Sequence, residues 1–255
     1  MKFCNICIVL ALAVVSGEPA IHGQNTGSKE KVTTRQEREI PVVDFVSTAN
    51  DSLPPQRRVK NHRHDLKDSK VDPARFMLKE SDPEELYELT PSHAPFRTAL
   101  PVLESDAVVI GEVVGSEAYL SNDRTSVYSE FTIQVGDLLK NTSRQDINIG
   151  SLLTAERDGG GVRFESGKVL RRGRVHETMP VVGQRYLLFL ERDNEAESFS
   201  IITGYELRDG RVFPLDGVNV AEAGSKLPQV AVYEGVQDAA FLNEIRIALT
   251  KIRFK

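Results

Sequence analysis

The stretch SVYSEFTIQV, residues 126–135, determines the fold class because its side chains alternate between apolar and polar. The apolar positions are Val127, Phe131, Ile133 and Val135, and between them lie Tyr128, Glu130, Thr132 and Gln134. Since successive side chains of a β-strand point to opposite faces, a period of two predicts a strand with one buried face.

Further β-rich segments, punctuated by Gly, Asp and Asn, lie on both sides of this strand. They are VVIGEVV (108–114), INIGSLLTAE (147–156), GKVLRRGRVH (167–176), RYLLFLER (185–192) and SIITGYELRDGRVFPL (200–215). Asp209 and Gly210, in the last segment, are the residue types that a two-residue hairpin turn requires. The chain from about residue 96 onward is therefore predicted to be mainly β.

The C-terminal segment, residues 235–255, has helical periodicity instead. Its apolar residues recur at helical spacing, at Phe241, Ile245, Ala248, Leu249 and Ile252. An acidic start and a basic end suit the helix dipole. We expect a terminal helix packed on the sheet, and the alternative is an amphipathic helix that binds a membrane or a partner.

The N-terminal stretch MKFCNICIVLALAVVSG, residues 1–17, has the layout of a signal peptide: one Lys, an apolar run of ten and small residues after it. We expect a secreted or periplasmic chain that starts near Glu18 and has no transmembrane segment. Both cysteines, Cys4 and Cys7, lie in this stretch. The mature chain would then have no disulfide and no cysteine nucleophile or metal ligand.

Residues 18–95 are rich in charged residues, Ser, Thr and Pro, with few apolar residues. Such a segment cannot bury enough surface to offset its ordering entropy, so we expect a mostly disordered arm or linker. A short helix is predicted at PEELYEL, 83–89, with Ser81 and Asp82 as cap candidates. The domains are then the signal peptide (1–17), the arm (18–95) and a β-domain with a terminal helix (96–255).

The glycine run in ERDGGGVRFESGK, residues 156–168, raises the question of a phosphate-binding loop. Such a loop needs Gly, four residues, Gly-Lys and then Ser or Thr. Here five residues separate Gly161 from Gly167, and Val169 follows Lys168. The spacing of the glycines differs from that of a phosphate-binding loop, and the required Ser or Thr hydroxyl is absent. We therefore predict a glycine turn and no nucleotide.

Other catalytic and metal motifs are incomplete. HETMP, 176–180, lacks the second histidine of a zinc-protease helix, and Pro180 would interrupt that helix. NHRHD, 61–65, is a weak metal-ligand cluster, and a solvated charged segment is the better interpretation. We predict no catalytic residue, no metal and no cofactor.

Two segments are basic against a chain of formal net charge -5, namely 157–176 and 57–70, each with six Lys or Arg and two acidic residues. Candidate ligand contacts in the first segment are Lys168, Arg171, Arg172, Arg174 and His176. They would suit an anionic polymer or an acidic protein partner. The alternative is a solvated loop and a solvated arm, since neither segment has interleaved aromatic residues.

Residues 104–216 resemble the netrin-module and tissue-inhibitor-of-metalloproteinase-like domains, which also occur in exported bacterial proteins of unknown function. The similar segments are SDAVVIGEVVGSE (105–117), YSEFTIQVGDLLKN (128–141) and GQRYLLFLE (183–191). The resemblance implies an OB-like five-stranded β-barrel, here with a C-terminal α-helix and a disordered N-terminal arm. Those inhibitors chelate zinc through an N-terminal cysteine, which the mature chain would lack, so protease inhibition is not implied.

The absent catalytic motifs and the export signal together predict a secreted, non-catalytic binding module for an unknown protein or anionic polymer. One alternative is an exported hydrolase, which would be favoured by a pocket that gathers two carboxylates, or Glu177 with His176. The other is a polyanion or cell-wall binder that uses the basic run 168–174.

Overall fold

The computed structural model describes residues 40–45, 53–65, 78–80, 98–174, 177–194, 198–216 and 232–253. The chain divides into two compact units, and all of these residues belong to the unit Thr34–Lys255. The predicted signal peptide and the predicted helix at 83–89 lie outside the described residues. Among the helices of the described part, none is both long and apolar enough to cross a membrane.

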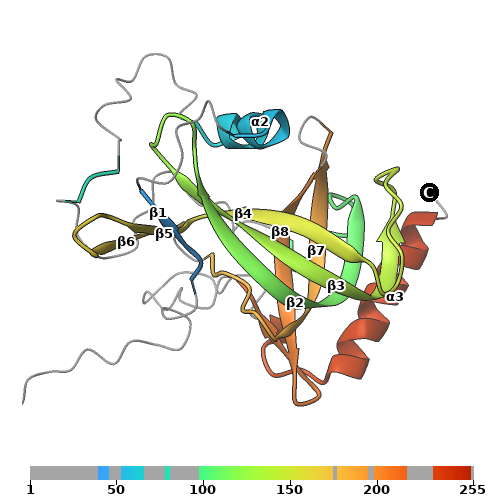
Figure 1. Ribbon diagram of the computed structural model, residues 1–255. Coiled ribbons are helices and arrows are strands. Elements are labelled where there is room, and N and C mark those ends of the chain that lie inside the picture. Colours follow the sequence, from blue (N-terminus) through green and yellow to red (C-terminus); the bar gives the residue numbers. More distant parts are fainter. Residues whose placement is uncertain are drawn as a thin grey trace, which may run out of the picture. The chain divides into compact units, whose positions relative to one another are not determined.

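The main sheet has six strands in the order β4-β3-β2-β7-β8-β9 (Figure 1). They are β4 (Leu152–Asp158), β3 (Val127–Asn141), β2 (Ala107–Leu120), β7 (Arg185–Asp193), β8 (Ser198–Arg208) and β9 (Arg211–Pro214). Neighbours in this order are antiparallel. β4 also pairs with β8 in parallel, so the sheet returns on itself as a ring. The prediction of a mainly β chain is confirmed.

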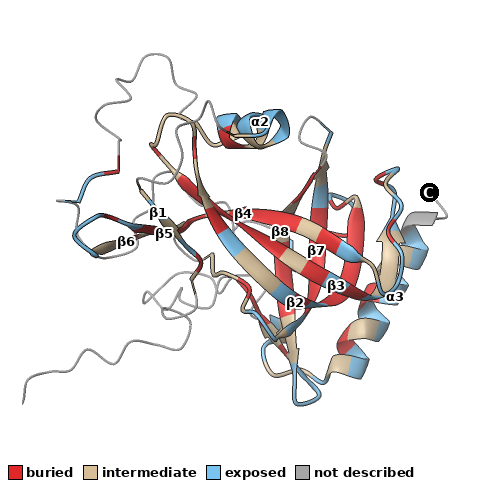
Figure 2. Cartoon of the chain, in the orientation of Figure 1, coloured by how far each residue is buried: buried red, intermediate tan, exposed pale blue. Residues whose placement is uncertain are grey.

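The inside of the ring is apolar because each strand presents alternate residues to it. Phe131 and Ile133 of β3 are fully buried there, as the period-two pattern predicts. They pack with residues of β2, β4, β7 and β8, including Val109, Ala155, Leu188 and Phe199. Figure 2 shows these buried positions repeating along the strands.

The predicted hairpin between β8 and β9 is also confirmed. Asp209 and Gly210 have φ of 52° and 70°, the left-handed values that a two-residue turn of this kind needs at both positions. Two strands are shorter than predicted. β4 begins at Leu152, after a turn at 148–151, and within the described residues 167–174 the strand is β6 (Val169–Arg172).

The predicted terminal helix is α3 (Asp238–Arg253), and it packs on the sheet. Phe241 and Ile245 are fully buried against the outer face of β2, β7 and β8. The ring of Phe241 lies 4.7 Å from the ring of Tyr205, centroid to centroid. An apolar stripe thus fixes α3 in its own domain.

A second, three-stranded sheet has the order β1-β5-β6, with β1 (Val42–Asp44) parallel to β5 (Gly160–Arg163). β1 and helix α2 (Pro55–Arg63) both come from the predicted arm. The sequence did not predict either element. The disorder of the rest of 18–95 stays a prediction, because most of that segment lies outside the described residues.

The glycine run serves close packing. Gly159 has φ of 109°, and a Cβ added there would lie 2.5 Å from Met179 Cε and 2.8 Å from the Arg172 carbonyl oxygen. At Gly161, an added Cβ would lie 2.8 Å from Val42 Cγ2. Glycine is needed because no side chain fits where β5 meets β1 and β6.

Candidate functional site: an acidic sheet face beneath a basic helix

Three glutamates lie side by side across the outer face of β2, β3 and β4. Glu117 is directly opposite Glu130, and Glu130 is directly opposite Glu156. We call these three residues the carboxylate row. Like charges in directly opposed positions destabilise a sheet, so this row needs cations.

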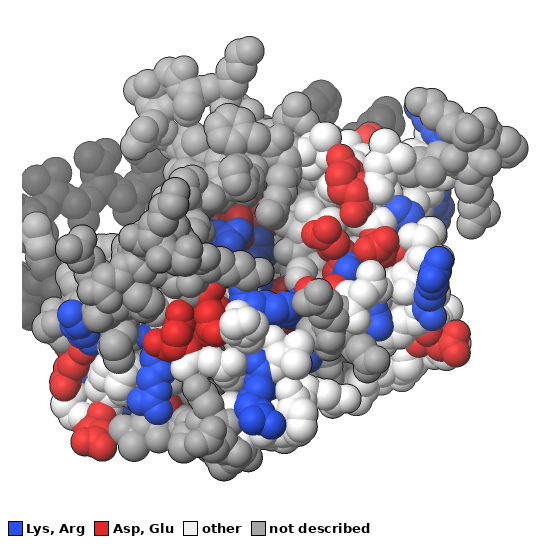
Figure 3. All heavy atoms as spheres, turned by 90° about the horizontal axis from the view of Figure 1, so that it is seen from above, with Lys and Arg blue, Asp and Glu red and all other residues white. Residues whose placement is uncertain are grey.

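Helix α2 supplies cations to two members of the row, Glu130 and Glu156, from above the sheet (Figure 1). Arg57 donates two hydrogen bonds to Glu130, at 2.7 and 3.0 Å, and Lys60 Nζ donates a third at 2.9 Å. Arg63 is paired with Glu156 and with Asp193 of β7. Under this cover Glu130 is only 8% exposed and Glu156 only 3%. In the view from above, basic and acidic side chains lie next to one another (Figure 3).

Aromatic stacking adds to the ionic contacts. The next row on the same face holds Tyr119, Tyr128 and Asp158. The His64 ring stacks on Tyr128 at 4.0 Å between centroids, and the Arg57 guanidinium lies 3.6 Å from the centroid of Tyr119. Planar cations on aromatic faces are attracted by the ring quadrupole, so this row also favours cations.

His64 lies between two carboxylates at the C-terminal end of α2. Its Nδ1 is 2.8 Å from Asp158 Oδ1, and its Nε2 is 3.4 Å from Glu156 Oε1. Burial alone would lower the pKa of His64, but Asp158 and Glu156 outweigh burial and raise it to about 9. Burial would raise the pKa of Asp158, whereas His64 and Arg174 lower it. At neutral pH this is an imidazolium with a carboxylate.

Backbone contacts hold the C-terminal end of α2 against the loop between β2 and β3. Ser126 Oγ donates to the His64 carbonyl at 2.5 Å, and the Asp123 amide donates to Asp65 Oδ1 at 3.0 Å. Asn122 Nδ2 donates to the Arg58 carbonyl at 3.0 Å. These bonds fix where the side chains of α2 meet the sheet.

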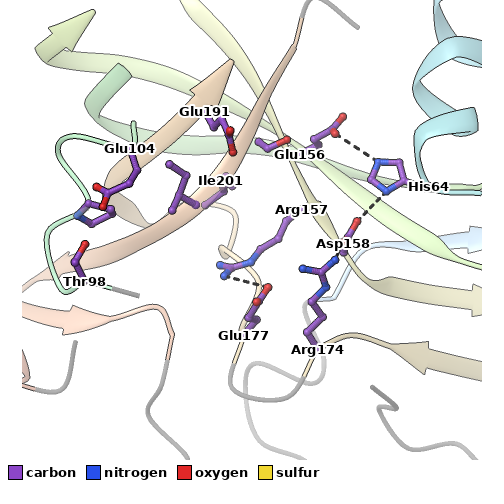
Figure 4. Close-up of a pocket in the computed structure, with 13 residues that line it drawn as sticks. His64, Thr98, Glu104, Glu156, Arg157, Asp158, Arg174, Glu177, Glu191 and Ile201 are labelled. Carbon is purple, nitrogen blue, oxygen red and sulfur yellow. Dashed lines mark hydrogen bonds and ion pairs between the residues drawn. The ribbon is translucent and has the colours of Figure 1, made fainter. Parts of the chain in front are cut away.

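A pocket of about 410 Å³ lies beside the end of α2, between β4 and β8 (Figure 4). The two strands pair only at Ala155–Phe199 and Glu156–Ser200, and the pocket begins where this pairing ends. Its acidic lining residues are Glu104, Glu156, Asp158, Glu177 and Glu191. Its basic lining residues are His64, Arg157 and Arg174.

Arg157 is the most buried cation of this pocket, with its side chain 2% exposed. Its Nη2 lies 2.5 Å from Asp216 Oδ1 and 3.7 Å from Glu177 Oε2, and Nη1 donates to the Thr178 carbonyl at 2.8 Å. Asp216 also accepts a hydrogen bond from Thr203 at 2.8 Å. Within the described part of the chain, Arg157 Nε has no hydrogen-bond partner.

Of the four predicted ligand-binding residues that the structure describes, only Arg174 lines this pocket. Arg174 is paired with Asp158, whereas Lys168 donates from the β5–β6 turn to the Glu80 carbonyl at 2.6 Å. Arg171 and Arg172 lie on β6. His176 lies outside the described residues, so its predicted role stays a prediction.

Sequence reasoning missed α2 as part of the site, although it singled out residues 57–70 as basic. The basic run 57–70 was the sequence signal for this site, because its Lys and Arg side chains pair with carboxylates of the sheet. In the stretch 61–65, Asp65 bonds the loop and His64 pairs with carboxylates. Among the described residues no cluster suits a metal ion.

No protein-family model matches this chain, and no curated protein is significantly similar to it.

Proposed function

We propose that this chain is a non-catalytic binding module whose carboxylate row receives a basic helical segment, and that α2 is the occupant supplied by the chain itself. The observation that carries the proposal is the match between α2 and the sheet. Arg57, Lys60 and Arg63 pair with Glu130 and Glu156, which the strand register places side by side.

The spacing of these cations explains why the ligand is helical. Residues 57, 60 and 63 are three apart, so a helix presents them on one face. Arg57 and Lys60 on that face both reach Glu130 of β3, and Arg63 reaches Glu156 of the neighbouring strand β4. Guanidinium groups suit this site because their planar fork can donate two bonds to one carboxylate, as Arg57 does.

An OB-type barrel related to the netrin-module and metalloproteinase-inhibitor domains fits this assignment. The ring pairing, with three consecutive antiparallel strands and a parallel closure, supports such a barrel. OB-folds bind ligands on their second and third strands and in the loop between the first two. The corresponding elements here are β3, β4 and the loop 121–126, where α2 lies. We propose a secreted or periplasmic location, in line with the predicted signal peptide.

An exported hydrolase is the second candidate, because the pocket does gather carboxylates near strand ends. Its chemistry is less well suited to catalysis than to binding. With a pKa near 9, His64 holds its proton at neutral pH, and Asp158, whose pKa is lowered, holds its negative charge. A general acid or base works best when its pKa lies near the operating pH.

Competition between α2 and an added copy of α2 tests the proposal. The host is residues 18–255 with Arg57, Lys60 and Arg63 replaced by Gln, and the probe is a fluorescent peptide of residues 53–65. We expect the peptide to bind this host at least tenfold more tightly than wild type by fluorescence anisotropy, because a tethered occupant competes at about millimolar effective concentration.

Two matched controls define the site. A peptide with the same three residues changed to Gln should not bind, and Glu130→Gln in the host should weaken binding of the unmodified peptide. Equal binding by wild type and the α2 variant, or binding indifferent to Glu130, would contradict the proposal. Turnover of an ester or glycoside panel that Asp158→Asn abolishes would favour the hydrolase.

A further inference from the structure

The pocket between β4 and β8 has a ligand chemistry of its own, separate from the basic-helix proposal. We propose that it is a binding site for a small organic ammonium compound that also carries a hydrogen-bond acceptor, such as an amino alcohol or an amino sugar. A volume of about 410 Å³ lies within the range of small-molecule sites.

The net negative charge of the pocket lining favours an ammonium group on the ligand. Five carboxylates line the pocket against two guanidinium groups and the protonated His64, which leaves two negative charges in excess. Three of the five are already paired: Glu156 with Arg63 of α2, Asp158 with His64, and Glu177 with Arg157. Glu104 and Glu191 lie on the opposite side, and neither side chain makes a hydrogen bond or an ion pair with the described residues. An ammonium group placed on this side would lie beside carboxylates that have no ion-pair partner among the described residues.

Arg157 defines the acceptor. Figure 4 shows its side chain between the Glu191 side of the pocket and the His64 side. Its Nε is buried and has no hydrogen-bond partner in the described structure, although a buried donor left unpaired costs about 1–3 kcal/mol. A hydroxyl or carbonyl oxygen of a ligand would satisfy this donor, and the lining side chains must shift to admit it because Nε is fully covered in this structure. The acidic lining and the unpaired donor are independent observations. The first favours an ammonium group and the second a hydrogen-bond acceptor, so together they indicate a ligand that carries both.

Apolar lining residues define the body of the ligand. Pro101, Ile201 and Ile202 line the same pocket. A compact ring or short chain between the ammonium group and the acceptor would contact them, and a long polyamine would leave both the apolar lining and Arg157 Nε unmatched. This argument favours a small amino alcohol over a polycation.

Three probes of one shape separate these contributions: trans-4-aminocyclohexanol, cyclohexylamine and cyclohexanol, titrated by NMR into residues 18–255 at low salt. We expect saturable binding of the amino alcohol with Kd below about 5 mM, weaker binding of cyclohexylamine, and none of cyclohexanol. Shifted amide signals should include those of Arg157, Glu191 and Ile201. Equal binding of all three probes, or no saturable binding of the amino alcohol, would overturn the proposal.

Variants assign the two groups. Glu104→Gln combined with Glu191→Gln should weaken both amines by about threefold to tenfold. Glu112→Gln is the matched control, because Glu112 is an exposed carboxylate on β2 outside the pocket. Arg157→Lys retains a cation beside Asp216 but removes Nε, so it should abolish the advantage of the amino alcohol over cyclohexylamine.

An equal effect of the control, or an unchanged ranking in Arg157→Lys with folding intact, would refute the assignment. These probes do not report on peptide binding at the carboxylate row, so failure here and failure of the proposed function can be told apart.

Discussion

Two helices cover the outer face of one sheet, but α3 is held by apolar burial and α2 by ion pairs. α3 buries Phe241 and Ile245 completely in an apolar cluster. α2 lays Arg57, Lys60 and Arg63 on paired carboxylates, and its buried residue is the polar Asn61. Salt does not weaken apolar burial, which also involves no titrating group, whereas ion pairs depend on both salt and pH. The comparison suggests a permanent element of the domain at α3 and an exchangeable one at α2.

The largest expected effect is on α3. Phe241→Ala should lower the free energy of unfolding by about 3–5 kcal/mol, because it removes a fully buried ring and leaves a cavity. Chemical denaturation measures this loss. Ile247→Ala is the control on the same helix, since Ile247 is 47% exposed, and should change stability by less than about 0.5 kcal/mol. Similar losses in both variants would mean that α3 is not fixed by its apolar stripe.

The second effect is local to α2. Arg57→Ala removes charge-assisted bonds worth roughly 1.5–3 kcal/mol, so amide exchange in α2 should speed up about tenfold to 150-fold. Protection in the ring strands should stay unchanged, because α2 opens without unfolding the sheet. Arg58→Ala is the matched control, because this exposed neighbour makes hydrogen bonds to the described residues through its backbone alone. Equal acceleration by the two variants would show that the ion pairs do not hold α2.

The same contrast separates what the sequence predicts from what it does not. Period-two and helical patterns predicted the ring strands, the Asp209–Gly210 turn and α3, because apolar burial leaves a periodic trace in one segment. The α2 site depends on a register that aligns Glu117, Glu130 and Glu156 from three separate strands, which no single segment reveals.

The burial of two charged residues, Glu130 and Arg157, could not be predicted from the sequence pattern. Glu130 lies on the face that alternation assigns to solvent, yet it is buried because α2 covers it. Arg157 shares its strand face with Leu153 and Ala155, and it enters the end of the ring because Asp216 and Glu177 neutralise it there. The sequence pattern did not predict this role. A charged residue is rarely buried without a partner, and the pattern around Arg157 does not show that Asp216 and Glu177 are its partners.

The third prediction concerns pH. The pKa of His64 is raised to about 9 from 6.5, so its protonated form stabilises the docked α2 fully below pH 6.5 and loses this contribution as the pH rises through 9. Glu130 and Asp158, whose pKa values are lowered, act in the opposite sense and stop contributing in acid. α2 should be most firmly docked between mildly acidic and neutral pH.

An NMR titration of the His64 ring measures this effect. The midpoint should lie near pH 9 in the wild type and fall in Asp158→Asn, which removes the 2.8 Å contact at Nδ1. Each unit of that fall corresponds to about a tenfold loss of preference for the imidazolium. A midpoint that Asp158→Asn leaves unchanged would mean that His64 is not held by this carboxylate.

Ionic strength should produce the smallest effect and the clearest contrast between the two helices. Raising NaCl from about 50 mM to 500 mM shortens the Debye length to a few ångströms, so we expect a several-fold loss of protection in α2. The side chains that make these pairs are partly buried, at 20% exposure for Arg57 and 10% for Glu130, and screening is therefore incomplete. Protection in α3 should stay constant or increase, because salt does not weaken apolar burial. An equal loss of amide protection in α2 and α3 would contradict the comparison, because it would mean that the same kind of interaction holds both helices.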